Sequence, residues 1–386
     1  MEIIHVQNAG HRAAFHRLPF RIYHNHPGWV PHLKQDVEQV FDPKKNRLFA
    51  EGAQARRWLL MREGETIGRV AAFINPRYSG GMEQPTGGLG FFECIEDEAA
   101  AHLLLQTAQD WLQAQGMEAV DGPINFGEKD RFWGLVVENF TELTSYGMNF
   151  NPAYYVPFFR SFGFEVYYNQ ICYMRAMADP VQPVFAAKAQ KVALEDFNVT
   201  NARGMSAESI GDAFRTVYNN AWGGHHGFKT MSEGQGRRLA KALKPAMDPD
   251  AVLFAWHGSK PIGFYVSIPE LNQIFDKVHG DLNLIGKLKF LYHKWRHTPT
   301  RLVGLVFGVD RAYHGQGVES AIIKWAEANL VSLGRYDDTI MTWIGDFNPK
   351  MIKVAENLGA TPYRKLQTLR KMMDPNRPVT RVPVAE

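Results

Sequence analysis

The sequence predicts an α/β protein made of two copies of one module, and two sets of landmarks lead to this prediction. The stretches "REGETIGRVAAFINP" (residues 62–76) and "WHGSKPIGFYVSIPE" (residues 256–270) each hold a Gly turn, a second Gly and an alternating apolar run. This is the pattern of a hairpin that feeds a strand. Gly68 in the first stretch and Gly263 in the second are 195 positions apart.

The second set of landmarks is a pair of short helices that each begin with Asn-Pro. They read "NPAYYVPFFRSFGF" from Asn151 and "NPKMIKVAENLGA" from Asn348. Asn is expected to cap the helix, Pro suits the first helical position, and Gly ends a helix in the left-handed conformation. The closing glycines, Gly163 and Gly359, are 196 positions apart. Because hairpin and helix repeat at one offset of half the chain, we expect a duplication.

Between these landmarks both copies continue in the same order. Apolar runs of strand length at residues 87–95 and 301–309 are each followed by an amphipathic helix. Further strands are expected at "EAVDGPIN" and "DTIMTWIG", each followed by the Asn-Pro helix and a last strand. The Pro- and Ala-rich segment 177–190 is the expected linker, so we place the modules at residues 1–180 and 190–386.

Composition limits the class of protein. The chain has 386 residues, which suits two domains, and 45% hydrophobic and 12% aromatic residues can fill their cores. Its 43 basic and 40 acidic residues leave a formal charge of +3, which excludes a general DNA-binding protein. Any affinity for anions must therefore be local.

Cysteine usage and hydropathy point to a compartment. The cysteines, Cys94 and Cys172, lie in sequences that read as buried strands and show no CxxC spacing, which is typical of the reducing cytoplasm. No signal-peptide core or apolar run of membrane-spanning length is present. Six histidines in the first 32 residues lack the spacing of a zinc site. We expect a cytoplasmic protein without a transmembrane segment or a metal.

A Gly-punctuated turn joins a strand to a helix in the second module. The strand ends at Val309, and "HGQGVE" (residues 314–319) leads into the helix. Two glycines let the backbone approach a ligand, and the turn presents N–H groups at the positive end of a helix, as a pyrophosphate requires. The alternative is a tight bend that uses Gly for steric reasons.

The order of these elements resembles the GNAT (Gcn5-related N-acetyltransferase) superfamily, whose Q/R-x-x-G-x-G/A turn holds the pyrophosphate of acyl-CoA. "VDRAYHGQGVESAII" and "NPKMIKVAENLGA" match two of its motifs, and the tandem arrangement is similar to bacterial two-module GNAT proteins of uncertain substrate. The resemblance implies two mixed, mostly antiparallel twisted sheets flanked by helices, and acetyl-CoA or another acyl-CoA as cofactor. The cofactor contacts that it implies come from Val309, His314, Gly315, Gln316, Gly317, Val318, Glu319 and Asn348.

Two departures from the family pattern lie in the second module. His314 stands where the family has Gln or Arg, and Glu319 stands where it has Gly or Ala. The Glu319 carboxylate repels a pyrophosphate by an amount of order 1 kcal/mol when both are solvated. Many GNAT enzymes also protonate the leaving thiolate with a Tyr on the Asn-led helix, but Ala355 and Phe159 occupy that position here and cannot donate a proton. The catalytic residues are therefore left unassigned.

The first module lacks the features of a cofactor turn. Its corresponding turn, "ECIEDEAA", has no glycine and carries four acidic residues, which repel a phosphate. We expect this copy to have lost its cofactor and to keep a structural or substrate-shaping role.

Two further segments are candidates for binding. In the GNAT arrangement the segment between the first two helices lines the acceptor pocket, so Trp222, His225 and His226 are candidates to orient or deprotonate an amine. A flexible Gly loop with exposed histidines is the alternative. Residues 282–309 contain no acid but several Lys and Arg interleaved with aromatics. They suit the 3′-phosphate of CoA, an acidic carrier protein or a membrane surface, or form a plain solvated helix face.

The function expected from these features is acyl-CoA-dependent N-acyl transfer, first of all N-acetyl transfer, to a small-molecule or peptide amine. Two alternatives stay open. One is a GNAT-like binding protein without catalysis, because Ala355, Phe159 and Glu319 depart from the enzymes. The other is a tandem-GNAT transferase that uses aminoacyl-tRNA, to which the basic segment supplies phosphate contacts.

Overall fold

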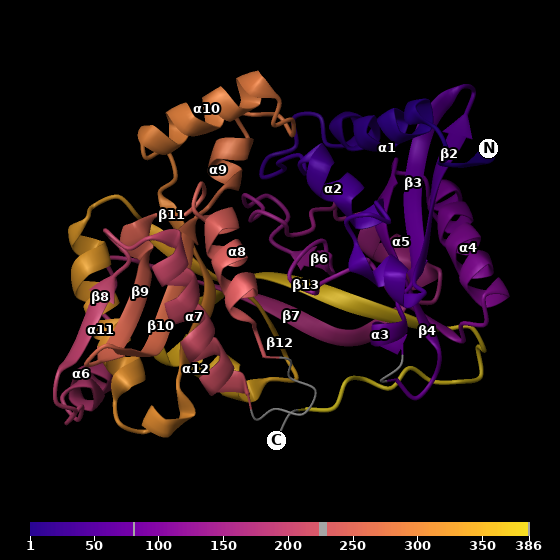
Figure 1. Cartoon of the computed structure of the whole chain (residues 1–386). Helices are drawn as coiled ribbons and strands as arrows, with labels where there is room; N and C mark the ends of the chain where they lie inside the picture. Colours follow the sequence, from indigo (N-terminus) through magenta and orange to yellow (C-terminus); the bar gives the residue numbers. More distant parts are fainter. Residues whose placement is uncertain (80–81, 224–229, 385–386) are drawn as a thin grey trace.

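The computed structural model describes residues 1–79, 82–223 and 230–384, and Figure 1 shows their course. The strands are β1 (Glu2–His5), β2 (Gln54–Arg62), β3 (Glu65–Ile74), β4 (Thr86–Cys94), β5 (Ala119–Gly122), β6 (Leu135–Glu138), β7 (Glu165–Ala176), β8 (Phe197–Asn201), β9 (Val252–His257), β10 (Lys260–Pro269), β11 (Arg301–Val309), β12 (Asp338–Gly345) and β13 (Thr361–Met372). The α-helices are α1 (Ala9–Ile22), α2 (Lys34–Phe41), α3 (Pro76–Ser79), α4 (Glu98–Ala114), α5 (Tyr155–Ser161), α6 (Pro183–Ala189), α7 (Ala207–Trp222), α8 (Glu233–Leu243), α9 (Asn272–Phe275), α10 (Leu284–Trp295), α11 (Val318–Ser332) and α12 (Pro349–Asn357).

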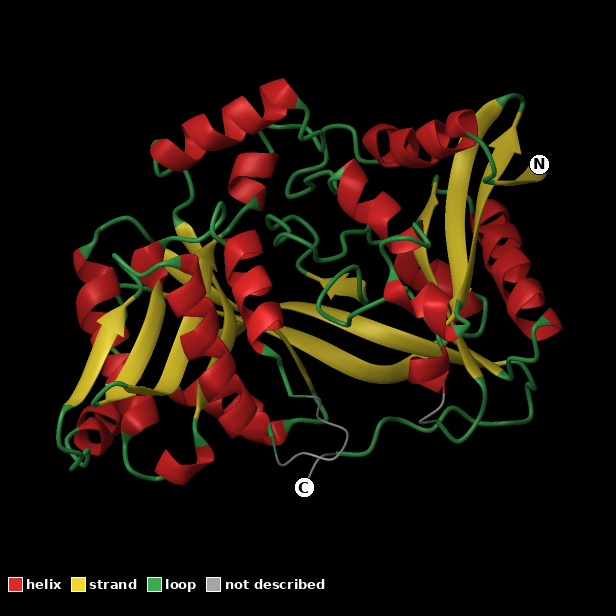
Figure 2. Ribbon diagram, in the orientation of Figure 1, coloured by secondary structure: helices red, strands yellow, loops and turns green. Residues whose placement is uncertain are grey.

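The expected α/β class and the mixed, mostly antiparallel sheets are confirmed. The described strands form one sheet in the order β1-β2-β3-β4-β5-β13-β7-β12-β11-β10-β9-β8, with β6 beside β13. The pairs β4–β5 and β11–β12 are parallel, and the other paired strands are antiparallel. In Figure 2 helices lie on both faces of this twisted sheet.

The two halves of the sheet are linked by their last strands. Strand β13, at the end of the chain, pairs with β5 and β6 of the first half, while β7 of the first half pairs with β12 of the second. Strands β7 and β13 also pair with each other, and Leu366 lies opposite Gln170, which is 196 positions earlier. Each half therefore receives a strand from the other, and the sheet is continuous.

The landmark glycines have the same packing role in both halves. A side chain on Gly68 would place its Cβ 2.5 Å from a methyl carbon of Leu104 on α4, and one on Gly263 would lie 2.8 Å from Ile322 on α11. Because glycine has no side chain, α4 lies directly on β3 and α11 lies directly on β10 at these positions. Arg69, the next residue of β3, contacts Phe15 of α1 on the opposite face.

The two Asn-Pro helices differ in how they begin. Asn348 caps α12, because its side chain accepts a hydrogen bond from the Met351 amide at 3.2 Å. The expectation that Asn151 caps a helix is wrong, since α5 begins only at Tyr155. The Asn151 side chain instead accepts from the amide of Val136 at 2.7 Å and donates to its carbonyl at 3.1 Å, which fixes β6.

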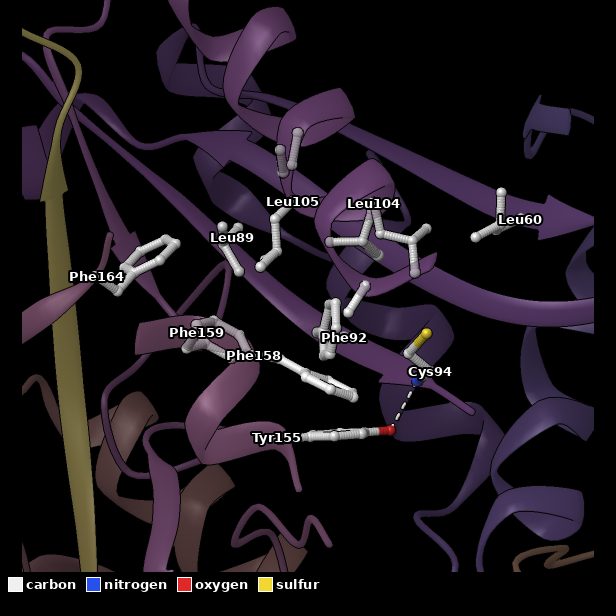
Figure 3. Packing of buried hydrophobic residues seen from close by; sticks show 14 of the residues in the cluster. Leu60, Leu89, Phe92, Cys94, Leu104, Leu105, Tyr155, Phe158, Phe159 and Phe164 are labelled. Carbon is white, nitrogen blue, oxygen red and sulfur yellow. Dashed lines mark hydrogen bonds between the residues drawn. The ribbon is translucent and has the colours of Figure 1, made fainter. Parts of the chain in front are cut away.

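The core of the first half lies between α4, α5 and the sheet. Phe92, Leu104, Phe158 and Phe159 pack there with other apolar side chains, as Figure 3 shows. The Tyr155 hydroxyl accepts a hydrogen bond from the Cys94 amide at 2.7 Å. Phe159 is therefore a core residue, and this space holds side chains of the protein itself.

Candidate active site

The second half of the sheet splits where its two parallel strands part. Strands β11 and β12 pair only from Arg301 to Gly304, opposite Asp338 to Met341. Leu305 has no partner in β10 or β12, because the register of β10 skips it between Val306 and Gly304. This irregularity turns the rest of β11 away from β12 and opens the sheet.

A cavity of about 480 Å³ lies at this split. Most of its lining is apolar and comes from β11, β12, α11 and α12, with Arg175, Met177 and Val181 added from the end of β7 and the segment that follows it. The cavity is large enough for a chain of many methylene groups. Its other lining residues include Tyr265, Leu302, Leu305, Phe307, Ile322, Ile323, Ala326, Leu330, Met341, Thr342, Trp343, Asn348, Met351 and Val354.

The Gly turn lies at the N-terminus of α11, whose Ile322 and Ile323 line the cavity. Gly315 and Gly317 both adopt positive φ, at 77° and 88°. The His314 ring donates from Nε2 to the Val309 carbonyl at 3.0 Å. The Gln316 side-chain amide donates from Nε2 to the Ala312 carbonyl at 2.9 Å. The side chains of His314 and Gln316 therefore help to hold the shape of the turn.

Asp310 fixes the residue that follows β11. Its carboxylate accepts hydrogen bonds from Lys260 at 3.0 Å, Asn220 at 2.8 Å and the Ala312 amide at 3.0 Å. Burial alone would raise the pKa of Asp310, but the hydrogen bonds from Lys260, Ala312 and Asn220 outweigh it and lower the pKa. The turn thus begins from an anchored, ionised carboxylate.

The N-termini of the two long helices differ. In α4 the Asp97 side chain accepts from the Ala100 amide at 3.0 Å and also pairs with Arg62 at 2.5 Å. Helix α11 has Gly317 as its N-cap and no side-chain cap. Among the described residues, the amides of Gly317, Val318 and Glu319 donate no hydrogen bond, although the Lys188 carbonyl lies close to Gly317. Free amides at the positive end of a helix suit an anion.

Gly317 has a steric reason as well. A Cβ at this position would lie 2.2 Å from the carbonyl oxygen of Lys188, in helix α6. Helix α6 lies beside α11, as Figure 1 shows. At Gly315, by contrast, a Cβ would meet nothing within 4 Å. Gly317 is therefore required for packing against α6, whereas Gly315 leaves the surface of the turn open. The turn can be a steric bend and a phosphate-binding site at the same time.

The corresponding split in the first half is filled by protein. Strands β4 and β5 pair only from Thr86 to Gly88, opposite Ala119 to Asp121. Beyond this point the Ile124 amide donates to the Leu89 carbonyl at 2.7 Å, and the Ile124 carbonyl lies 1.9 Å from where a Cβ of Gly90 would be. The space that is a cavity in the second half is therefore closed by the chain itself.

The predicted site residues are placed as follows. Of the expected cofactor residues Asn348 lines the cavity and Val309 is buried in a cluster with Ile322. Residues 314–317 form the turn, and Val318 and Glu319 begin α11. Trp222 packs on Phe264, on the sheet face opposite α11, with ring centroids 6.1 Å apart. His225 and His226 lie outside the described residues.

The positions that hold a catalytic Tyr in many GNAT enzymes are in the core. Ala355 is fully buried against Tyr173 and Ile344, and Phe159 is fully buried in the first half. Within residues 1–79, 82–223 and 230–384 no group of three or more metal-ligating side chains occurs. No helix in this part of the chain is long and apolar enough to cross a bilayer.

Comparison with solved structures identifies the architecture. A tandem GNAT protein from the clavulanic acid biosynthesis pathway superposes with a TM-score of 0.53 over 97% of this chain and 99% of its own, at 10% identity. The chain has a GNAT-like fold. A GCN5-related glucosamine N-acetyltransferase region of a fungal multi-domain β-N-acetylglucosaminidase matches this GNAT-like chain over 96% of its length at 11% identity and a TM-score of 0.54, covering 38% of that protein.

Two curated proteins are similar along the whole GNAT-like chain. "Bacterial ceramide synthase" from Caulobacter vibrioides is 26% identical over 385 residues, covering 97% of this chain and 98% of its own. "Protein YghO" from Escherichia coli is 24% identical over 370 residues, covering 93% and 92%. No family model matches the sequence.

Sequence reasoning missed most of the cavity. The motif directs attention to the turn, whereas the lining comes from strand interiors and from the inner side of α11. One signal was present: Gly304 interrupts the apolar run of β11 at the point where pairing with β12 ends. Glycine inside a strand commonly marks a bulge or a close approach.

Proposed function

We propose that this GNAT-like protein transfers a long fatty acyl group from acyl-CoA to the amine of a long-chain amino-alcohol lipid base. The observation that carries the proposal is the apolar cavity of about 480 Å³ at the split between β11 and β12. An acetyl group needs only a small part of such a volume, whereas a fatty acyl chain fills it. The relative named bacterial ceramide synthase supports the lipid acceptor, because a ceramide is the N-acyl product of such a base.

The residues present fit an acyl-CoA. The free amides of Gly317, Val318 and Glu319 would hold the pyrophosphate at the positive end of α11. The pantetheine arm would run along β11 beside Asn348, and the acyl chain would enter the apolar cavity. The first half would bind no CoA, because Ile124 closes its split and Asp97 caps the N-terminus of α4. Its role would be to hold β13 in place through pairing with β5.

The reaction needs mainly positioning. The amine must reach the thioester as a free base; its nitrogen bonds to the carbonyl carbon, the C–S bond breaks, the sulfur leaves with CoA and the ammonium proton is lost. Leu305, unpaired on both sides at the split, would supply a backbone amide that polarises the carbonyl. An acceptor would approach from the face of Trp222, opposite α11.

The test is a transfer assay. Protein, palmitoyl-CoA and a sphingoid base such as sphinganine in detergent micelles should yield the N-acyl product and free CoA, both detected by mass spectrometry. Acetyl-CoA should react at least ten times more slowly. Binding of CoA by titration calorimetry without transfer to any amine would overturn the proposal in favour of a binding protein. Absence of heat at millimolar acyl-CoA, with folded protein, would refute the site itself.

A further inference from the structure

Helix α10 presents an apolar face to solvent. Six large apolar side chains of this one helix are between 55% and 75% exposed. They recur at intervals of one, four, seven, eight and eleven residues from the first, so at about 100° per residue they fill one continuous arc of about 120°. They are Leu284, Ile285, Leu288, Leu291, Tyr292 and Trp295.

The opposite face of α10 holds the helix to the protein. Phe290 stacks on Phe275 of α9, with ring centroids 5.6 Å apart, and the Lys294 ammonium donates to the Pro245 carbonyl. Gly286 is buried against the Asp281 carbonyl. The packed face of α10 is therefore the one that carries Phe290, Lys294 and Gly286, and the apolar arc is a second, exposed face of the same helix.

Basic side chains border the apolar arc on both sides. Lys287 lies at one edge, and Lys289 and Arg296 lie at the other, all three exposed. No acidic residue occurs between Leu282 and Val309, and among the described residues no carboxylate pairs with these three. Long basic side chains beside an apolar stripe can extend to the phosphates of a bilayer while the stripe enters it.

Helix α1 adds basic residues near the same edge of the molecule as α10. In Figure 1 α10 and α1 lie along the same upper edge of the molecule, on opposite halves. Helix α1 packs on the sheet through Phe15 and Leu18 and carries the exposed side chains of Arg12 and Arg17. Exposed basic side chains therefore occur on both helices of this edge.

We propose that α10 is an interfacial anchor that inserts its apolar face into a bilayer rich in anionic phospholipid. A docking site for an acidic protein would place charge, not six apolar side chains, at its centre. The proposal goes beyond the transfer reaction and does not depend on it. It fits that reaction, because the chain passes from α10 into β11, whose residues line the acyl cavity.

The experiment is co-sedimentation of the full chain with vesicles, without acyl-CoA or amine. Wild-type protein should sediment with phosphatidylglycerol–phosphatidylcholine vesicles and at least tenfold less with phosphatidylcholine alone, and 0.5 M salt should weaken binding. Leu288→Glu with Trp295→Glu should reduce binding at least tenfold. Lys287→Glu with Lys289→Glu should remove the preference for anionic lipid. Leu239→Glu, on the exposed side of α8, is the matched control and should bind as wild type.

Other outcomes overturn the proposal. Wild-type protein that stays in the supernatant with anionic vesicles, or Leu288→Glu with Trp295→Glu that still sediments with them, excludes a membrane anchor at α10. A wild-type dimer by light scattering that Leu288→Glu converts to a monomer, with no vesicle binding, would assign the face to a second copy. Transfer in detergent micelles is measured separately, so loss of vesicle binding with retained transfer refutes only the anchor.

Discussion

Arg370 of β13 and Asp121 of β5 form a buried bidentate ion pair across the two halves of the chain. Their bonds are 2.6 Å and 2.7 Å long, and the side chains are 5% and 0% exposed. The Arg370 guanidinium also stacks on Tyr167. Burial lowers the pKa of Arg370, but the hydrogen bond and the charge of Asp121 outweigh it and raise the pKa. The last strand is therefore fixed to the first half by charge as well as by the sheet.

Breaking this pair should destabilise the protein strongly. Arg370→Ala leaves the Asp121 carboxylate buried without its cation and with the Tyr78 hydroxyl as a remaining donor, so we expect a loss of about 3–5 kcal/mol in the free energy of unfolding. Urea unfolding followed by circular dichroism measures it. Arg377→Ala, which removes the exposed pair with Glu118, should cost less than about 1 kcal/mol. Equal losses in the two variants would contradict this assignment.

Removing the carboxylate of Glu319 should tighten CoA binding. Glu319→Gln deletes a negative charge beside the amides proposed to hold the pyrophosphate, and about 1 kcal/mol corresponds to a roughly fivefold lower Kd. Titration calorimetry with CoA measures it. Glu98→Gln, in the first turn of α4, is the matched control and should leave the Kd unchanged. An unchanged Kd for Glu319→Gln would mean that the phosphates bind elsewhere.

Filling the cavity should shorten the acyl chain that is accepted. Ala326 lines the cavity on α11, and Ala326→Phe occupies space that the far end of a long chain would use. We expect at least a tenfold fall in kcat/KM for palmitoyl-CoA and little change for butyryl-CoA. Ala328→Phe, exposed on the same helix, should leave both rates unchanged. A similar fall for both donors would indicate general damage instead of a chain-length effect.

Substituting Gly315 or Gly317 by Ala should lower the free energy of unfolding by different amounts. Gly315→Ala meets open space and should cost only the left-handed strain, about 1–2 kcal/mol of unfolding free energy. Gly317→Ala has the same strain and also clashes with the Lys188 carbonyl, so it should cost clearly more. Thermal and urea unfolding of both variants test this order, and a reversed order would show that α6 does not pack against the turn.

Glu270 should make stability depend on pH. It is fully buried, accepts from the Tyr146 and Asn272 amides at 2.9 Å, and has a pKa raised by burial above the ordinary value of 4.5. A raised pKa in the folded state means that its contribution is present below 4.5 and is lost as the pH rises through the folded pKa.

Glu270→Gln keeps an acceptor for both amides and does not ionise. Its stability relative to wild type should therefore increase from pH 4.5 to pH 8, by about 1.4 kcal/mol for each unit by which the pKa is raised. Urea midpoints at three pH values measure this. Glu165→Gln, at an exposed site, is the control and should show no trend. A flat difference for Glu270→Gln would mean that the carboxyl titrates normally.

The sequence by itself predicted the α/β class and the mixed sheet flanked by helices. The signals that it used are local: alternating apolar runs, glycines in turns and Asn-Pro at a helix start. They were therefore sufficient to place Gly68 and Gly263 in strands and Asn348 at a helix N-terminus. The same local reasoning failed at Asn151, because its amide bonds to Val136 on another element instead of capping its own helix.

Only the tertiary structure decided that a cavity lies at the split between β11 and β12 and that one face of α10 is exposed. The split of β11 from β12 lies at the unpaired Leu305, and its counterpart in the first half is closed by Ile124. Gly304 marks the place in the sequence, but strand pairing decides that the sheet opens there. The exchange of β7 and β13 depends on pairing between segments far apart in sequence. Residues 282–309 could be recognised as basic, but which side of α10 is exposed follows from the packing of Phe290 on Phe275. Periodicity shows that a helix has an apolar face, and only its neighbours determine whether that face is buried.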